Sequence, residues 1–326
     1  MPCLYHNQKF KIQNMKIGLI GCGYLGKIHA KCIKEVKNVD LVGVYDISQE
    51  AAEEAAEKFF TTAYFELQAL IDNCDVVDIV ASTTDHFELA KQAIIAGKHC
   101  FVEKPLTATV EEAMKLIELA KKHNVVVQVG HVERYNSAFL AALPHLSHPF
   151  FIEAQRLSKF NWRGSDVSVV HDLMIHDIDL VLSMMRSEVV DIQAIGYQFI
   201  TDSIDMANAR LRFANGGIAH ITASRIAAHP LRKMCIFQPK NYLTVDFQEK
   251  KVEIIEFENR QTFVTEIPIV EHNAIVEELS DFIQTIQRNR TPKVTMNDGL
   301  NALCIADKVV TEILQKNYAN ITINTK

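Results

Sequence analysis

Short apolar runs alternate with amphipathic segments along the first 130 residues of the chain. Runs such as MKIGLI (15–20) are bounded by glycine or polar residues, which is typical of strands that are buried on both faces. Between these runs, apolar residues recur three or four positions apart, as they do in an amphipathic helix. The pattern predicts strands at 15–20, 41–46, 76–82, 99–104 and 125–130, and helices at 25–36, 49–60, 86–97 and 109–123.

This alternation predicts an α/β domain over residues 15–133. Strands that are separated by helices run parallel, so the helices are expected to cover both faces of a doubly wound, Rossmann-type sheet. Residues 1–14 are polar and mixed, and we interpret them as a loose N-terminal extension. An upstream start codon, or residues added to the natural chain, is an equally open interpretation of that segment.

The pattern changes after about residue 150. A strand at 150–157 and a helix at 167–185 are followed by a series of short strands between 189 and 267, with turn sequences such as ANGG and QPKN between them. This series predicts a large, mostly antiparallel, open-faced sheet. We therefore expect residues 134–326 to form an α+β domain for substrate binding and oligomerisation. Helices at about 272–288 and 297–317 close the chain, and the second of them can pack back on the Rossmann domain.

Composition narrows the class of protein. The 326 residues carry a formal net charge of −6, which argues against a nucleic-acid-binding protein because such proteins present a basic surface. No run of about 18 apolar residues is present, so no membrane-spanning helix is expected. The seven cysteines are odd in number and form no C-x-x-C pair, as is typical of reduced thiols. These features predict a cytoplasmic enzyme.

The sequence GCGYLG joins the first strand to the first helix. Gly21 permits a tight turn, Gly23 lets the backbone approach a pyrophosphate, and Gly26 lets helix and strand pack closely. Tyr24 and Leu25 open the helix, whose N-terminus offers N–H groups to phosphate oxygens. On its own the sequence could equally be a glycine-rich strand-to-helix turn. Its position between a strand and a helix favours a dinucleotide-binding loop.

Asp46 ends the second strand, twenty residues beyond Gly26. A carboxylate at this position can accept hydrogen bonds from the ribose hydroxyls of an adenosine, and it repels a 2′-phosphate. The sequence therefore predicts NAD as the cofactor in preference to NADP. The alternative is a turn aspartate without a ligand, since aspartate is common at strand ends.

The ends of the third and fourth strands carry further candidates for the cofactor site. Glu103 and Lys104 begin the sequence EKP, and Lys104 is expected to reach the nicotinamide because ligands of parallel sheets bind beyond the carboxyl ends of the strands. Ser82, Thr83 and His86 follow the third strand and are expected to line the nicotinamide ribose. The alternatives are a solvated loop lysine and, for Ser82 or Thr84, a helix cap.

The helix at 167–185 contains the sequence HDLMIHDIDL, in which Asp172 and His176 share one face at a spacing of four. If that face meets Lys104, the histidine can take the proton of a hydroxyl group while the lysine stabilises the developing alkoxide. A solvated polar helix face is the plain alternative. A metal site is not expected, because neither an HExxH sequence nor a ligand from a second element accompanies the helix.

Together, GCGYLG, Asp46, the EKP sequence and the D-x-x-x-H sequence give the chain a resemblance to the Gfo/Idh/MocA family of NAD(P)-dependent oxidoreductases, from Met15 onward. The resemblance implies a dehydrogenase acting on CH–OH groups, with Lys104, Asp172 and His176 as catalytic residues and His176 as the acid/base. It also implies that the second domain's open sheet pairs subunits into a homodimer or homotetramer. Met174 stands where the family often has glycine, so we expect added bulk near the active site.

Three segments, GHVERYN, FNWRGSDVSVVHDLMIHDIDL and ASRI, resemble a branch of this family that oxidises the 3-hydroxyl of UDP-N-acetylglucosamine on the way to lipid A precursors. This implies a nucleotide-sugar substrate, whose diphosphate would need cations such as arginine. The residues expected to contact the substrate are Arg134, Tyr135, Asn136, Arg163 and Arg225. Each arginine could instead form an ordinary ion pair.

Other functions stay open at this level. The substrate could be an inositol or a free sugar. The same fold is also similar to that of NAD-dependent glycosidases, which cycle the hydride internally, and of non-catalytic sugar-sensing proteins. A sensor has no need of Lys104, Asp172 and His176, so their joint presence favours a dehydrogenase.

Overall fold

The strands of the N-terminal half form one six-stranded parallel sheet in the order β3-β2-β1-β4-β5-β6. The computed structural model describes residues 14–162, 164 and 167–324. The strand order reverses direction between β1 and β4, and a crevice for ligands opens at such a point. The strands are β1 (Met15–Ile20), β2 (Val39–Tyr45), β3 (Ala63–Tyr64), β4 (Val76–Ile79), β5 (His99–Glu103) and β6 (Val127–Gly130).

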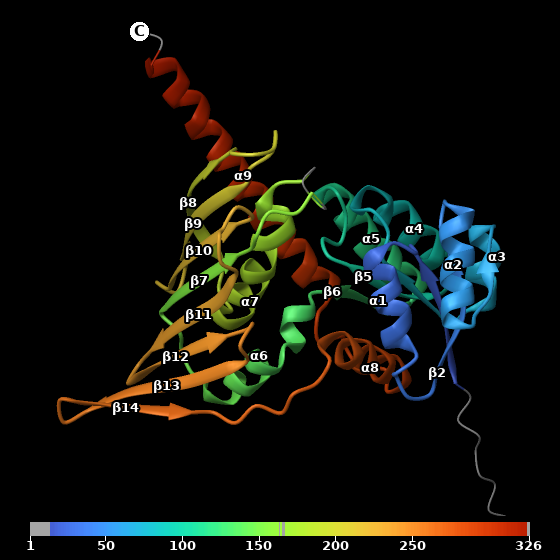
Figure 1. Ribbon diagram of the computed structural model, residues 1–326, viewed down its shortest axis with the longest axis horizontal. Coiled ribbons are helices and arrows are strands. Elements are labelled where there is room, and N and C mark those ends of the chain that lie inside the picture. Colours follow the sequence, from blue (N-terminus) through green and yellow to red (C-terminus); the bar gives the residue numbers. More distant parts are fainter. Residues whose placement is uncertain (1–13, 163, 165–166, 325–326) are drawn as a thin grey trace, which may run out of the picture.

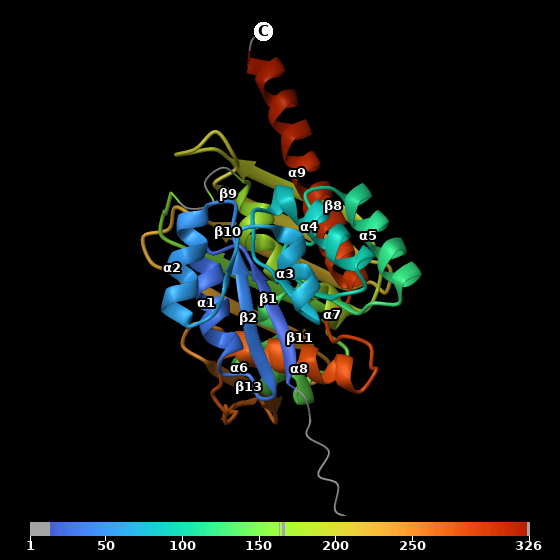
Figure 2. The same cartoon turned by 90° about the vertical axis from the view of Figure 1, so that its right-hand side faces the viewer.

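Helices cover both faces of this sheet (Figures 1 and 2). Their ends follow local capping chemistry: Ser48 caps α2, and Thr109 with Glu112 forms a reciprocal capping box at the start of α5. The helices that lie between the strands are α1 (Tyr24–Ile33), α2 (Gln49–Phe59), α3 (Leu67–Asn73), α4 (Thr83–Ile95) and α5 (Val110–His123). The sequence pattern missed β3 and α3, because two and seven residues are too few to display a period.

The second sheet has eight strands in the order β14-β13-β12-β11-β7-β10-β9-β8. Its strands pair antiparallel except for β7 with β10, so the predicted mostly antiparallel sheet is confirmed. The strands are β7 (Phe151–Leu157), β8 (Val189–Tyr197), β9 (Met206–Phe213), β10 (Ile218–Ser224), β11 (Leu231–Gln238), β12 (Asn241–Asp246), β13 (Lys251–Glu258) and β14 (Gln261–Glu266).

Helices of the C-terminal half pack on one face of this sheet and also join the two sheets. In Figure 1, α7 and the first part of the long α9 lie between the large sheet and the Rossmann-type unit, and the C-terminal part of α9 projects beyond the sheet. Met174 is fully buried in the core beneath the large sheet. The expected bulk of its side chain near the active site stays a prediction. The helical segments are η1 (Val132–Tyr135), α6 (Ser137–Ala142), η2 (Leu143–His145), the π-helical turn η3 (Val170–Met174), α7 (Ile175–Met185), α8 (Ala274–Gln287) and α9 (Met296–Asn324).

Two C-terminal helices contact the first sheet. On α8, Leu279 and Phe282 join the core around Ile17 and Phe101. Near the start of α9, Gly299 packs against Val129 of β6 so closely that an added Cβ would lie 2.9 Å from that side chain. The return of the last helix to the Rossmann-type sheet therefore follows from close backbone packing. The domain boundary between residues 133 and 134 remains a sequence-based prediction.

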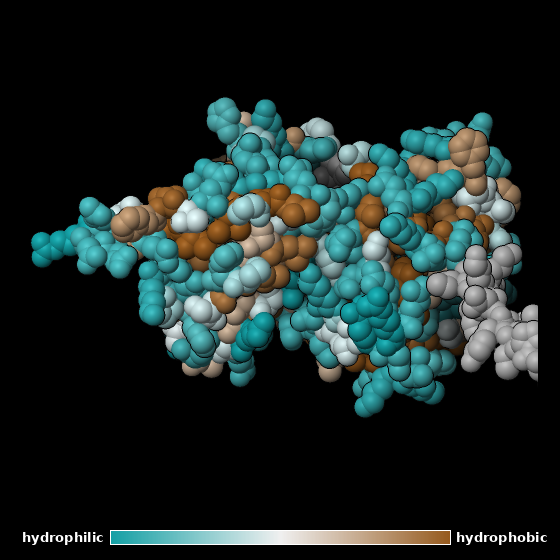
Figure 3. Space-filling view, turned by 90° about the horizontal axis from the view of Figure 1, so that it is seen from below, coloured by the Kyte–Doolittle hydropathy of each residue, from teal (hydrophilic) through white to brown (hydrophobic). Residues whose placement is uncertain are grey.

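The outer face of the large sheet carries aromatic side chains in contact across five strands. Ring centroids of Phe151 and Phe237 lie 5.5 Å apart, those of Phe237 and Tyr242 4.9 Å, and those of Tyr242 and Phe257 6.1 Å, while His220 meets Phe151 edge-on. Hydrophobic side chains also gather over the half of the molecule that this sheet forms when it is seen from below (Figure 3). We call these five side chains the aromatic ladder.

Within the described residues, no helix has the length and apolar character needed to cross a membrane.

Candidate active site

A cavity of about 560 Å³ lies at the carboxyl ends of β1, β2 and β4, where the strand order reverses. Ligands of open parallel sheets bind at this place. Thr84 and Asp85, which the sequence reasoning missed, also line it because the first turn of α4 faces the cavity. The predicted cofactor residues that line the cavity are Gly21, Gly23, Tyr24, Leu25, Asp46 and Ser82.

Each of the three positions in the loop has glycine for a different structural reason. Gly21 has a φ of +98°, and a Cβ there would lie 2.5 Å from the carbonyl oxygen of Val80. A Cβ on Gly26 would lie 1.8 Å from the carbonyl oxygen of Gly21, so only glycine fits. A Cβ on Gly23 would meet nothing within 4 Å. Gly23 begins a helix that no side chain caps, so it leaves an open place for a pyrophosphate at the helix N-terminus.

Asp46 ties the glycine loop to the second strand. Its Oδ2 accepts the N–H of Cys22 at 2.7 Å, and its Oδ1 accepts the N–H of Ser48 at 2.9 Å. A carboxylate oxygen can accept more than one hydrogen bond, so both oxygens keep capacity for a ribose diol. The residues that line the cavity therefore fit a dinucleotide.

Five predicted cofactor residues are not among those that line the cavity: Gly26, Thr83, His86, Glu103 and Lys104. Thr83 is in the first turn of α4 but does not line the cavity. The buried His86 places its ring nitrogens 2.9 Å from the carbonyl oxygen of Pro105 and 3.1 Å from that of Ala81, so it connects α4 to the segment after β5. Burial lowers the pKa of His86. Glu103 turns its carboxylate inward toward the buried His29. Ser82 precedes α4 without making a cap hydrogen bond from its side chain.

Lys104 joins the end of β5 to the helical turn η3 of the C-terminal half. Its ammonium Nζ donates to the main-chain oxygen of Asp172 at 2.7 Å and lies 3.4 Å from Oδ1 of the same residue. The two side chains are 16% and 33% exposed, so the pair is partly shielded from solvent and still open to a ligand. Asp172 lies in the π-helical turn η3. Such turns are rare in proteins overall, and those that occur are often found at functional sites.

His176 follows on the first turn of α7 and is half-buried. Within the described residues, its Nδ1 has no hydrogen-bond partner. Burial lowers the pKa of His176 well below its ordinary value, and the positive charges of Lys104 and Arg156 lower it further. The imidazole is therefore neutral at neutral pH and can accept a proton.

Two buried arginine–carboxylate pairs hold α7 in place. Arg156 of β7 bonds both oxygens of Asp177 at 2.8 and 2.9 Å, and Arg134 of η1 bonds both oxygens of Asp179 at 2.6 and 2.7 Å. Paired contacts of this kind fix orientation as well as distance. They set the rotation of α7 and hence the direction of His176. Arg134, expected to bind substrate, is thus engaged in anchoring the helix.

Three further predicted substrate residues, Tyr135, Asn136 and Arg225, are also engaged in the fold. Tyr135 is 1% exposed, and its hydroxyl donates to Asp281 at 2.8 Å. Asn136 caps α6 by accepting the N–H of Ala138. Arg225 is buried and donates to the carbonyl oxygens of Gly164 and Val167. Arg163 lies outside the described residues. Sequence alone did not reveal these roles, because the partners of Tyr135 and Arg225 lie far away along the chain.

Sequence reasoning also missed an arginine and a histidine close to the site. His131 follows β6, is 1% exposed, and has no hydrogen-bond partner for either ring nitrogen within the described residues. Arg232 is half-exposed, and its charge contributes to the low pKa of His176, after burial and the charges of Lys104, Arg156 and His131. Arg232 lies two residues before the buried Met234 on β11. Side chains two apart on a strand point to the same face, so Arg232 lies on the inner face of the sheet. The position of Arg232 in its strand is the one sequence signal that could have identified this residue.

No group of three or more histidine, cysteine or acidic side chains within the described residues is placed to hold a metal ion.

Comparisons with known proteins agree with this fold. Residues 15–131 match the model of an oxidoreductase family with an NAD-binding Rossmann fold, and residues 128–243 match that of the GFO/IDH/MocA C-terminal domain. The chain is 36% identical over 286 residues to the UDP-N-acetylglucosamine 3-dehydrogenase of Acidithiobacillus ferrooxidans, covering 85% of this chain and 90% of that protein. It is 27% identical to the myo-inositol 2-dehydrogenase of Thermotoga maritima, covering 89% and 94%.

A solved structure of the Acidithiobacillus ferrooxidans UDP-N-acetylglucosamine 3-dehydrogenase, GnnA, superposes with a TM-score of 0.88 at 34% identity. The superposition covers 92% of this chain and 98% of that chain. The two proteins therefore share both sheets and the way in which the sheets are joined.

Proposed function

Because the chain belongs to the Gfo/Idh/MocA family of NAD(P)-dependent oxidoreductases, we propose that it oxidises a ring hydroxyl of a nucleotide sugar to a ketone. The observation that carries the proposal is the contact of Lys104 with Asp172, which brings the end of β5 against the helix that bears His176. Lys104 directly follows β5, so it stands at the carboxyl edge of the sheet, where the glycine-loop cavity also lies, although none of the three side chains lines that cavity.

We propose UDP-N-acetylglucosamine as the substrate and its carbon 3 as the oxidised position. The similarity over most of both chains to an enzyme named for that reaction supports this choice. A myo-inositol 2-dehydrogenase is a more distant relative at 27% identity, so inositol or a free sugar is the second candidate.

In the proposed reaction the C–H and O–H bonds of a carbinol break and a C=O bond forms. The glycine loop and Asp46 would hold the nicotinamide cofactor, which would supply the acceptor for the hydride that leaves the carbon. The neutral imidazole of His176 takes the hydroxyl proton, and its low pKa keeps it available as a base. Lys104 donates a hydrogen bond to the substrate oxygen as negative charge develops there, and Asp172 holds the lysine side chain in that direction.

NAD is proposed in preference to NADP. Asp46 lines the cavity, and two backbone N–H groups hold its carboxylate by hydrogen bonds. This carboxylate would repel a 2′-phosphate and accept hydrogen bonds from an unmodified ribose.

We assign binding of the substrate diphosphate to Arg232 in place of Arg134 and Arg225. Those two arginines are largely buried and engaged in the fold. Arg232 has a side chain 51% exposed on the inner face of the sheet, and its only ion-pair contact within the described residues is a long one, 3.9 Å to Glu133. An arginine that keeps its donors available can bind two phosphate oxygens at once.

We also propose a homodimer or homotetramer that forms through the outer face of the large sheet, because the aromatic ladder is a broad apolar surface. A cytoplasmic location is supported by the free thiols of the described cysteines.

The decisive experiment measures NADH formation with UDP-N-acetylglucosamine, myo-inositol and glucose, with product identification by mass spectrometry. We expect a product two hydrogens lighter than UDP-N-acetylglucosamine, and no turnover in His176→Ala. Release of a free sugar without net NADH would instead indicate a glycosidase. Turnover of the polyols without any turnover of nucleotide sugars would refute the proposed substrate.

A further inference from the structure

A buried chain of charged side chains lies directly behind Lys104. His29 of α1, Asp78 of β4 and Glu103 of β5 are each less than 10% exposed. Nδ1 of His29 lies 2.9 Å from Oδ2 of Asp78, and its Nε2 lies 3.2 Å from Oε1 of Glu103. The second contact is an ion pair without the alignment of a hydrogen bond. One imidazole thus joins a helix and two strands.

The surroundings of His29 favour its charged form. Burial opposes the charge, but the facing carboxylates of Asp78 and Glu103 outweigh burial and hold the pKa of His29 well above its ordinary value. An imidazolium has an N–H on each ring nitrogen, so it can face two carboxylates at once. A buried charge of this kind is stable only while its partners stay in place.

Glu103 connects the buried His29 to the main chain of Lys104. Its Oε2 accepts the main-chain N–H of Lys104 at 3.1 Å, while its Oε1 faces His29. The adjacent strand leaves room for this side chain only because residue 130 is glycine: a Cβ on Gly130 would lie 2.6 Å from Oε1 of Glu103. The position of the Glu103 carboxylate is therefore determined by packing as well as by charge.

His29 lies one helical turn beyond Gly26, on the helix whose N-terminus borders the cofactor cavity. We propose that His29 and Glu103 are positioning residues that fix Lys104 relative to the cofactor-binding helix α1. This inference rests on the proposed dehydrogenase function. It gives Glu103 a role that does not require contact with the cofactor.

Glu278 of α8 supplies a matched control. Its carboxyl is buried in the same region, and neither oxygen has a hydrogen-bond partner within the described residues. Burial raises the pKa of Glu278 well above its ordinary value, and the negative charge of Glu103 raises it further. Replacing it by glutamine removes a buried carboxyl without touching the contacts of Lys104.

The first measurement compares kcat and the KM for NAD in Glu103→Gln and Glu278→Gln. Since small displacements of catalytic groups cost one to two orders of magnitude, we expect Glu103→Gln to lower kcat by about tenfold or more. The KM for NAD should change little, because the glycine loop is intact. Glu278→Gln should keep the kcat of the parent protein. An equal loss in both variants would overturn the proposal, because it would reflect general disturbance of the buried region.

Gly130→Ala is the second variant, since it displaces the Glu103 carboxylate without removing any charged group from the chain. It should reproduce the loss of kcat, and His29→Gln should do so too. If Gly130→Ala and Glu103→Gln both retain full kcat, His29 and Glu103 do not position the lysine.

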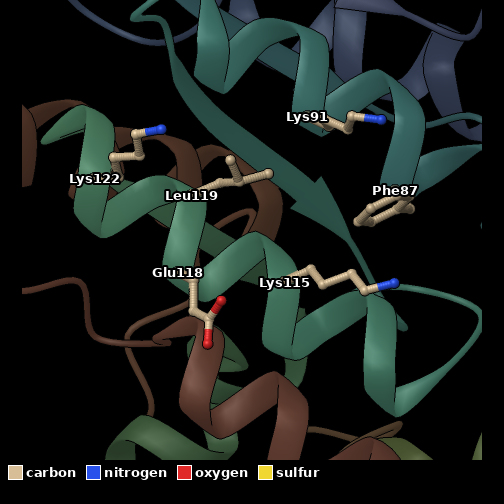
Figure 4. Close-up of a pocket in the computed structure, with 6 residues that line it drawn as sticks. All are labelled: Phe87, Lys91, Lys115, Glu118, Leu119 and Lys122. Carbon is tan, nitrogen blue, oxygen red and sulfur yellow. The ribbon is translucent and has the colours of Figure 1, made fainter.

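A second readout needs no turnover. Trace acetylation followed by mass spectrometry reports the reactivity of each lysine amine. Lys115 and Lys122 are exposed on α5, beside the hollow between α4 and α5, and serve as internal references (Figure 4). In Glu103→Gln the labelling of Lys104 should rise several-fold relative to these two, because the released ammonium group leaves the carbonyl of Asp172. Unchanged labelling would contradict the proposal even if the dehydrogenase assay finds no substrate.

Discussion

Lys104 and Asp172, 68 residues apart in the chain, meet through a hydrogen bond of 2.7 Å from the ammonium Nζ to the main-chain oxygen. The acceptor is a backbone atom, so the contact depends on the path of the π-helical turn as well as on the aspartate side chain. The Asp172 carboxylate adds a longer contact of 3.4 Å. This pair therefore has a structural part, from the backbone, and a chemical part, from the carboxylate.

Replacing Asp172 by asparagine separates the two parts. Asp172→Asn keeps the main-chain contact and removes the negative charge, so we expect kcat to fall by about 10- to 100-fold with little change in the melting temperature. Steady-state kinetics and differential scanning fluorimetry measure the two quantities. Asp307→Asn is the control, since Asp307 pairs with His171 of the same turn at 2.7 Å without reaching Lys104. Equal losses in the two variants would contradict a specific role for Asp172.

The protonation of His176 predicts the pH dependence of the reaction. The pKa of this imidazole is lowered by burial and then by Lys104, so its base form should persist below the ordinary histidine pKa of about 6.5. The acidic limb of kcat/KM should accordingly lie below that value. Lys104→Met removes a neighbouring positive charge, which raises the pKa of His176 and should move the acidic limb upward. An acidic limb that stays in place in Lys104→Met would show that the limb reports another group.

Local sequence patterns were enough to select most of the residues for which we propose a chemical role. The glycine loop, Asp46 and the spacing of Asp172 and His176 each belong to one short segment, so their geometry follows from the strand or helix that holds them. Lys104 could be placed because it directly follows a strand of a parallel sheet. The fold class of the chain followed from the spacing of apolar residues in its strands and helices.

Roles that depend on distant partners could not be predicted in this way. Arg134 looked suited to bind phosphate, but its partner Asp179 lies 45 residues away and only the packing of η1 against α7 unites them. The same holds for Arg225, whose acceptors in the segment before η3 lie 58 and 61 residues away. Glu103 sits at the expected strand end, yet whether its side chain faces the cofactor or the buried His29 is decided by the space that Gly130 leaves.

Asp46 should determine the choice between NAD and NADP. Asp46→Asn retains an oxygen that can accept the N–H of Cys22 but removes the charge that repels a 2′-phosphate. We expect the ratio of the dissociation constants for NADPH and NADH to fall by about tenfold, which corresponds to about 1.4 kcal/mol. Titration of protein fluorescence with each nucleotide measures both constants. Asp85→Asn, which changes a charge elsewhere in the same cavity, should leave the ratio unchanged.

Arg232 should distinguish a nucleotide sugar from a free sugar. Arg232→Gln removes the cation assigned to the diphosphate, and loss of one charged hydrogen-bonded contact raises KM by about 10- to 100-fold. The effect should be confined to substrates that carry the diphosphate, with kcat reduced much less. Arg212→Gln, a change of a half-exposed arginine on β9, is the control. If Arg232→Gln leaves the KM for UDP-N-acetylglucosamine unaltered, the diphosphate binds elsewhere.

The aromatic ladder predicts how copies of the chain associate. Phe237 lies at its centre, 5.5 Å from the ring of Phe151 and 4.9 Å from that of Tyr242, on the face of β11 opposite the core. A carboxylate introduced there would be buried without a partner in an assembly and solvated in a single chain, so Phe237→Glu should shift the mass in solution toward the monomer. Light scattering coupled to gel filtration measures that mass. Ile95→Glu, a similar change at a half-exposed position on α4, should leave it unaltered. A parent protein that is itself monomeric at micromolar concentration would rule out the proposed assembly.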